Sequence, residues 1–174
     1  MPPTSPPRRA APAPVPAGRR VLAAIGPKML GLARDPAARA IPYLVTPQFT
    51  AQARDILGDQ SFLAPEMDEG RSRHRPDPRP PHRRDYLTTY LALPNYTNSL
   101  KRAGYADEDF ESGGSDRLLD ALVALGDADR TRIRTRTRTR TRTRVEEYPK
   151  AGADHVAVQV VLPRGQGYSE LAPL

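Results

Sequence analysis

The segment "RTRIRTRTRTRTRTRV", residues 130–145, limits the possible folds of this chain more than any other feature. Arginine stands at every second position, and threonine fills almost all the gaps. In a helix this spacing would put arginine on every face, and in a strand it would give one arginine face and one threonine face. Neighbouring like charges repel, and a helix that docks on a sheet needs an apolar face. We therefore expect the Arg-Thr run to be exposed, poorly ordered, or helical without a buried face.

The basic character of the chain is confined to three low-complexity blocks. The 174 residues contain 27 Lys and Arg against 20 Asp and Glu, a net charge of +7. Besides the Arg-Thr run, an arginine-proline tract covers residues 70–84, and a Pro/Arg-rich arm that we expect to be disordered covers residues 1–20. The remainder is acidic. Arginine blocks can neutralise phosphates, but no aromatic residues interleave in the run for base stacking. A basic protein that binds polyanions or nucleic acid is therefore the alternative interpretation.

Several classes of site are disfavoured by the composition. There is no cysteine, which excludes disulfides and thiolate metal sites. His74, His82 and His155 are not spaced as metal ligands on one face, so we expect no metal site. No apolar run has the length of a membrane span, and residues 1–20 lack the apolar core of a secretory signal. These observations favour a cytoplasmic, soluble protein without a membrane partner.

Short apolar runs alternate with helical patterns along the acidic part of the chain. The runs are apolar almost throughout, as strands buried on both faces are. Strand–helix–strand–helix order with such strands predicts parallel βα units in an α/β fold. The expected strands cover residues 21–25, 41–45 and 155–162, with a candidate third strand at 61–67.

The helix signals follow the strands directly. Pro27 and Pro47 suit the first helical position, and Thr46 is a good N-cap. Further on, tyrosines and leucines recur at helical spacing over residues 86–104, with an interruption at Pro94. Another helix is expected from Ser115, as its N-cap, to Gly126. Its buried stripe would consist of Leu118, Leu119, Leu122 and Val123.

Six segments in register resemble one known family. They are "VLAAIGPKMLGLARD", "PYLVTPQFTAQARDILG", "LAPEM", "YLALPNYTNSLKRAGY", "GGSDRLLDALVALGD" and "AGADHVAVQVV". Together they resemble the C-terminal half of luciferase-like monooxygenase family proteins, within the oxidoreductase subgroup that uses the deazaflavin coenzyme F420. The resemblance implies a partial (β/α)8 TIM-type barrel over residues 21–174. It also implies hydride transfer between the cofactor, F420 or alternatively FMN, and an unknown small-molecule substrate.

The chain also departs from the family pattern. Ala38 and Arg39 stand where members commonly have Asp-Gly, and the two basic tracts, 70–84 and 130–145, replace amphipathic helix sequence. Slippage or a frame change in a repetitive GC-rich gene would produce such tracts. We expect an inactive or incomplete fragment that self-associates or aggregates, because half a barrel exposes strand edges and apolar surface.

Two strand-to-helix turns are the candidate cofactor site. In a βα barrel the reactive face lies at the carboxyl ends of the strands, and helix N-termini there favour anions. The resemblance implies that Gly26, Pro27 and Lys28, with Thr46 and Pro47, hold the ribityl-phosphate part of the cofactor. Alternatively, the Gly-Pro and Thr-Pro pairs serve only as helix starts. No catalytic residue can be named from the sequence.

Three further residue groups are weaker candidates. Asn95, Tyr96 and Asn98 could line a substrate pocket, but such a segment more often packs its own helix. His155 has the character of a packed or surface residue. Glu66 lies near a possible strand end, with no partner carboxylate assigned to it from the sequence.

Overall fold

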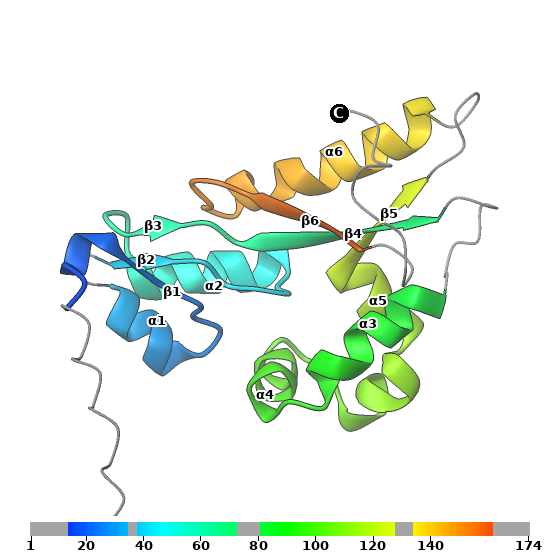
Figure 1. Cartoon of the computed structure of the whole chain (residues 1–174), viewed down its shortest axis with the longest axis horizontal. Helices are drawn as coiled ribbons and strands as arrows, with labels where there is room; N and C mark the ends of the chain where they lie inside the picture. The colour runs from blue at the N-terminus through cyan, green and yellow to red at the C-terminus, as the bar shows by residue number, and fades with distance from the viewer. Residues whose placement is uncertain (1–13, 35–37, 73–80, 128–133, 162–174) are drawn as a thin grey trace, which may run out of the picture.

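The computed structural model describes residues 14–34, 38–72, 81–127 and 134–161 (Figure 1). Most of the arm at residues 1–20, part of each basic tract and residues 162–174 lie outside this description. The strands are β1 Arg20–Leu22, β2 Ala38–Ala40, β3 Phe62–Leu63, β4 Glu66–Ser72, β5 Val123–Asp127 and β6 Ala157–Val161. The helices are η1 Ala17–Arg19, α1 Pro27–Ala33, α2 Pro47–Leu57, α3 Pro81–Leu91, α4 Pro94–Arg102, η2 Asp107–Gly113, α5 Asp116–Leu122 and α6 Arg134–Lys150.

All strand pairs are parallel, as the sequence predicts for an α/β fold. One sheet has the order β1-β2-β3 and the other the order β5-β4-β6. β3 and β4 are separated only by Ala64 and Pro65, so one extended segment contributes to both sheets. β6 pairs with β4 and not with β1 or β2. The strand expected at residues 41–45 is wrong: β2 covers Ala38–Ala40, and residues 41–46 form a loop, in which Pro42 has no amide hydrogen to donate and Leu44 has a φ of 54°. The described strands form no closed barrel.

The predicted helix starts are confirmed at α1 and α2. Pro27 and Pro47 each occupy the first turn, and the Thr46 hydroxyl accepts a hydrogen bond from the Phe49 amide at 3.2 Å. α2 ends at Gly58, whose φ of 71° is a conformation that glycine adopts without steric cost. Proline at the first turn and glycine past the last explain why the sequence locates both ends of α2.

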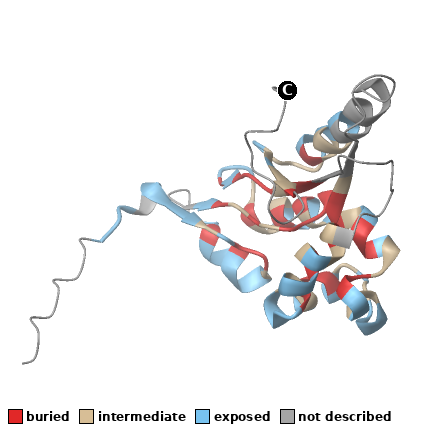
Figure 2. Cartoon of the chain, turned by 45° about the vertical axis from the view of Figure 1, so that its right-hand side comes forward, coloured by how far each residue is buried: buried red, intermediate tan, exposed pale blue. Residues whose placement is uncertain are grey.

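The two faces of the strands are covered by different helices. Ala40 and Leu63 are paired in register and pack on the same side, with α1 and α2. On the other side Tyr43 and Val123 pack with α3, α4 and α5. Figure 1 shows α6 across β4 and β6 from α3, α4 and α5, and Figure 2 shows buried residues along the strands and on the facing helices. The site described below lies between the sheet and the α3–α4 pair.

The predicted helix from Ser115 to Gly126 is wrong in its second half. Ser115 is the N-cap, accepting from the Leu118 amide at 3.2 Å, but α5 ends at Leu122. Val123 begins β5 and pairs with Asp68 of β4. Val123 is fully buried. An apolar residue here suits a buried helix and a buried strand equally well, so its hydrophobicity does not distinguish the two. The backbone pairing with β4 makes Val123 part of a strand.

The boundaries of two basic blocks also differ from prediction. β4 continues through residues 70–72, and α3 begins at Pro81, so both ends of the arginine-proline tract belong to regular elements. Arg83 is fully buried and donates to the carbonyls of Leu119 and Val123. In the arm, residues 17–19 form η1 and Arg20 begins β1.

The Arg-Thr run forms most of α6. Its first residues and the side chains of residues 134–141 lie outside the description, while Arg142 and Thr143 are exposed. The buried part of α6 comes after the run: Tyr148 is fully buried and donates to the Val45 carbonyl at 2.8 Å. The C-terminal turns of α6 therefore help to attach the helix, whereas the expectation that the run has no buried face falls mostly on side chains outside the described residues.

Candidate functional site

The five predicted cofactor-binding residues lie at two helix starts on one edge of the sheet. β1 and β2 are parallel neighbours, so the turns that follow them, at Gly26 and Thr46, lie at the same carboxyl edge. Pro27 and Lys28 are exposed there, whereas Pro47 is buried. Thr46 is only 5% exposed, and its hydroxyl oxygen already accepts from Phe49. The α1 start is thus the accessible one, and Thr46 acts as a helix cap.

Helix α4 packs against the α1 start. The Ser99 hydroxyl donates to the Ile25 carbonyl at 3.0 Å, and Arg102 Nη2 donates to the same oxygen at 3.3 Å. Gly26 lies beside this guanidinium, because a Cβ built at Gly26 would be 3.9 Å from Arg102 Nη2. Arg102 was not among the candidates from the sequence. It is 76 residues from Gly26 along the chain, and no local pattern links them.

A tyrosine cluster, formed by Tyr43, Tyr86, Tyr90 and Tyr96, lies between the sheet and the α3–α4 pair. The ring centroids of Tyr43 and Tyr90 are 5.2 Å apart, as are those of Tyr90 and Tyr96. The Tyr43 hydroxyl is hydrogen-bonded to those of Tyr86 and Tyr90, the latter at 3.0 Å. Burial is the main cause that raises the pKa of Tyr43, Tyr86 and Tyr96, so these hydroxyls remain protonated at neutral pH.

Asp68 of β4 lies under this cluster and is fully buried. The Tyr86 hydroxyl donates to Asp68 Oδ1 at 2.9 Å, while Oδ2 has no hydrogen-bond partner. Burial raises the Asp68 pKa to about 7; the Tyr86 hydrogen bond opposes this rise, and the nearby Glu66 carboxylate adds to it. Burial also raises the pKa of Glu66. The site can therefore hold a proton near neutral pH.

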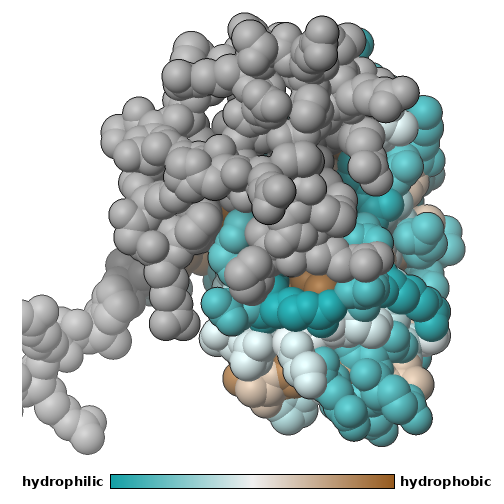
Figure 3. Space-filling model, turned by 90° about the vertical axis from the view of Figure 1, so that its right-hand side faces the viewer, coloured by the Kyte–Doolittle hydropathy of each residue, from teal (hydrophilic) through white to brown (hydrophobic). Residues whose placement is uncertain are grey.

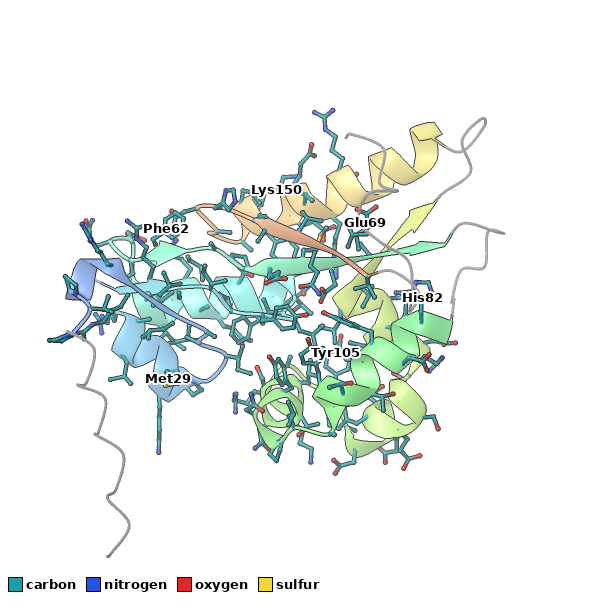
Figure 4. All side chains as sticks on the ribbon, in the orientation of Figure 1. Met29, Phe62, Glu69, His82, Tyr105 and Lys150 are labelled. Carbon is teal, nitrogen blue, oxygen red and sulfur yellow. The ribbon has the colours of Figure 1, made fainter. Side chains whose placement is uncertain are left out.

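The strand period could have identified this pair of carboxylates. Glu66 and Asp68 are two residues apart on β4, so their side chains leave the same face. The candidate strand expected from the sequence, residues 61–67, stops one residue short of Asp68. Figure 4 labels Glu69, the next residue along β4, on the α6 side of the strand, away from α3, α4 and α5. This is the alternation expected of a strand.

The loop that brings Tyr43 to the cluster contains backbone strain. Leu44, the next residue, has a φ of 54°, in the left-handed region that non-glycine residues rarely adopt. Such a conformation costs about 1 kcal/mol or more and persists where packing enforces it. Leu44 is 3% exposed and packs in the core with α3, α4 and α5. Its burial therefore helps to fix the position of Tyr43.

The other sequence candidates are distributed differently. Tyr96 belongs to the tyrosine cluster, whereas Asn95, Asn98 and His155 are exposed, with no contact that would make a pocket of them. The described residues include no group of three or more His, Cys, Asp or Glu side chains arranged to hold a metal ion. Within the described chain, no helix combines the length and apolar character needed to cross a bilayer.

Comparisons with protein-family models, curated proteins and solved structures found no match to this chain. The geometry and the sequence motifs are thus the basis on which a function can be argued. They provide an accessible helix start with two nearby cationic residues, and a buried acid beneath a hydrogen-bonded tyrosine cluster.

Proposed function

We propose that this chain is the C-terminal part of a luciferase-like (β/α)8 domain, from an oxidoreductase that uses F420 or, alternatively, FMN. The observation that carries the proposal is the pair of adjacent parallel strands, β1 and β2, that each lead into a helix start at one sheet edge. Ligands of α/β folds bind at the carboxyl ends of strands. The order β1, β2, β3/β4 also follows the chain, as it does in a barrel.

The residues at the α1 start fit an anionic group better than those at the α2 start. Gly26 provides no side-chain cap for α1, and exposed Lys28 and Arg102 lie on the elements that meet there. Thr46 and Pro47 are buried, so their side chains are not accessible to a ligand. A ligand could contact only the backbone at the α2 start, and only after a local movement. We therefore assign the cofactor's phosphate to Gly26, Pro27, Lys28 and Arg102, with Thr46 and Pro47 supporting the neighbouring turn.

The cofactor, when bound, would supply the hydride chemistry. The chain's own contribution is binding and orientation, since cofactor enzymes use the protein for position and electrostatics. Lys28 and Arg102 would neutralise phosphate charge. The substrate would be a small organic molecule. We expect the chain alone to be an incomplete enzyme that still binds the cofactor, but more weakly than a full barrel does, because a cofactor at the mouth of a full barrel would lose half of its contacts here.

Cofactor binding by matched variants tests this assignment. F420 and FMN are titrated into the full chain at low ionic strength, and binding is followed by cofactor fluorescence. Lys28→Gln and Arg102→Gln should each weaken binding by about tenfold, the equivalent of about 1.4 kcal/mol for one charge-assisted contact. Lys101→Gln is the control, because it removes the same charge from a residue of α4 that pairs with Asp107 at 2.5 Å. Equal effects of all three variants, or no binding by the parent chain, would contradict the assignment.

The alternative, polyanion binding through the Arg-Thr run, has less support from the described arginines. Arg142 and Arg144 at the end of the run pair with Glu146 and Glu147 at 2.9 and 3.0 Å. These contacts partly neutralise the C-terminal end of the run within the helix. Salt separates the two functions: binding of a duplex DNA that falls steeply between about 50 and 200 mM salt would favour the alternative.

A further inference from the structure

Asp68 is a buried carboxyl, and among the described residues no cation compensates its charge. It lies near the middle of β4 and is fully buried, with Tyr86 as the hydrogen-bond donor to Oδ1 and no partner for Oδ2. Lone buried carboxylates are costly, and proteins normally pair them or keep them neutral. The helices α3 and α4 supply Tyr86 and Tyr96 on this side of the sheet.

The side chains near the Asp68 carboxyl come from each of the elements packed around it. Gln159 of β6 is its register partner, but the amide Nε2 of Gln159 donates to the Tyr86 hydroxyl at 3.4 Å, not to the carboxyl. Val123 of β5, the register partner on the other side, is apolar. Among the described residues, no cation acts on the Asp68 carboxyl. The titratable groups that face or influence it are Glu66 from β4, Tyr43 after β2, Tyr86 from α3, Tyr96 from α4 and Tyr148 from α6.

We propose that Asp68 makes the docking of the α3–α4 pair on the sheet sensitive to pH. The protonated carboxyl accepts the Tyr86 hydrogen bond and fits the buried position. The ionised carboxylate has one hydrogen bond, no cation, and Glu66 on the same face of the strand. Ionisation therefore favours a state in which α3 and α4 move away from β4 and water reaches the carboxyl.

The direction of the pH dependence follows from the raised pKa. The ordinary value is 3.8 and the folded value is about 7, so the folded chain holds this proton more tightly than the unfolded chain does. The corresponding contribution to docking is fully present below about pH 4 and is lost as the pH rises through 7. A shift of about three pKa units corresponds to a fall of up to about a thousandfold in the ratio of docked to undocked molecules.

Hydrogen exchange on the full chain tests the proposal. Protection of amides in residues 81–102 is measured in dilute samples at pH 5.5 and 8.5, after correction for the intrinsic pH dependence of exchange. We expect protection to fall at pH 8.5 by at least tenfold in the parent chain and to stay within about twofold in Asp68→Asn, which cannot ionise. Asp59→Asn removes an exposed carboxyl after α2 and should keep the parent's fall.

A second variant keeps the test decisive if Asp68→Asn fails to fold. The Tyr86 hydrogen bond favours the ionised carboxylate, so its removal in Tyr86→Phe should raise the Asp68 pKa further. The pH at which half of the protection is lost should therefore be higher than in the parent chain. Equal protection at both pH values in the parent chain would overturn the proposal. So would a fall in Asp68→Asn as large as the parent's, or an unchanged midpoint in Tyr86→Phe.

Discussion

At the scale of single residues, Arg54 joins segments that are far apart in the sequence. Its guanidinium donates to the carbonyls of Gly58, Ser61 and Gly152, each at 2.8 Å, and to Asp154 Oδ2 at 2.7 Å. Asp154 Oδ2 also accepts from the Leu63 amide at 2.8 Å. The planar fork of arginine satisfies all four acceptors at once, which a single ammonium cannot do. Arg54 thereby fixes the turn between α6 and β6 against the end of α2.

Arg54→Lys should consequently destabilise the chain by about 2–3 kcal/mol. The Arg54 side chain is only 15% exposed, so carbonyls that lose its guanidinium as a donor are poorly reached by water. Urea denaturation followed by circular dichroism measures the change. Arg117→Lys is the control: the Arg117 side chain is 65% exposed, and we expect a loss below about 0.5 kcal/mol. A loss for Arg54→Lys no greater than the control's would show that the four contacts are dispensable.

At the scale of elements, local signals predicted α2 well because its ends depend on a few neighbouring residues. Thr46 caps the helix, Pro47 begins it and Gly58 ends it. Thr46→Ala should cost about 1 kcal/mol of stability by removing the acceptor for the Phe49 amide. Thr46→Ser should restore most of it in the same urea titration. Thr89→Ala, at an exposed position in α3, should change stability by less than about 0.5 kcal/mol.

Elements whose identity depends on distant partners were predicted poorly. The apolar stripe of residues 118–123 suited a helix throughout, and only pairing with β4 makes Val123 the start of a strand. Spacing indicated the packing face of Tyr86 and Tyr90. It could not bring Tyr43 or Asp68 to them, because those contacts join α3 to the loop after β2 and to β4. Of the candidate site, the helix starts were therefore predictable, whereas Arg102 and the contact between Asp68 and the tyrosine cluster were not.

The buried charged side chains of the described residues lie close together in the sequence, between residues 68 and 83. Among the described residues, the buried charged side chains are Asp68, Glu69 and Arg83, and all three lie in or beside the arginine-proline tract, residues 70–84. Buried charge is costly, so strands and helices that evolved as a core rarely contain it. This coincidence of burial and charge supports a replaced sequence on a retained packing position.

Sequencing of the gene tests that interpretation. Codons 68–84 and 130–145, read in the other two frames, should encode an apolar strand end and amphipathic helices with apolar residues at helical spacing. Such a frame would place apolar side chains where Asp68, Glu69 and Arg83 are now buried. Low-complexity sequence in all three frames would contradict a frame change and make the basic tracts original to the protein.

At the scale of the whole molecule, an exposed row crosses the first sheet. Val21, Arg39 and Phe62 are register partners on β1, β2 and β3, on the face opposite α1 and α2. Val21 is 50% exposed and Phe62 38%, and Arg39 lies over the Phe62 ring at 5.6 Å from its centroid. Figure 3 shows a different side of the molecule, where the surface that is not grey is mainly hydrophilic.

The edge of β1 adds to this exposure. The Ile41 amide donates to the Leu22 carbonyl at 2.9 Å, so Leu22 faces β2 and, by the alternation of a strand, the Val21 amide and carbonyl face away from it. In the described structure β1 pairs with β2 alone. An open edge beside apolar side chains is the combination that promotes association between chains.

We therefore expect the isolated chain to self-associate and to reduce neither F420 nor FMN at a measurable rate. Sedimentation velocity over a hundredfold range of concentration should show growth of species larger than a monomer. Val21→Lys with Phe62→Lys should suppress this growth, because the added charges repel across the row and leave the α1–α2 side intact. Leu32→Lys, at a position 65% exposed on α1, should not suppress it. A parent chain that sediments as a monomer at every concentration and turns over a deazaflavin would contradict both expectations, since it would mean that the described strands suffice without further barrel units.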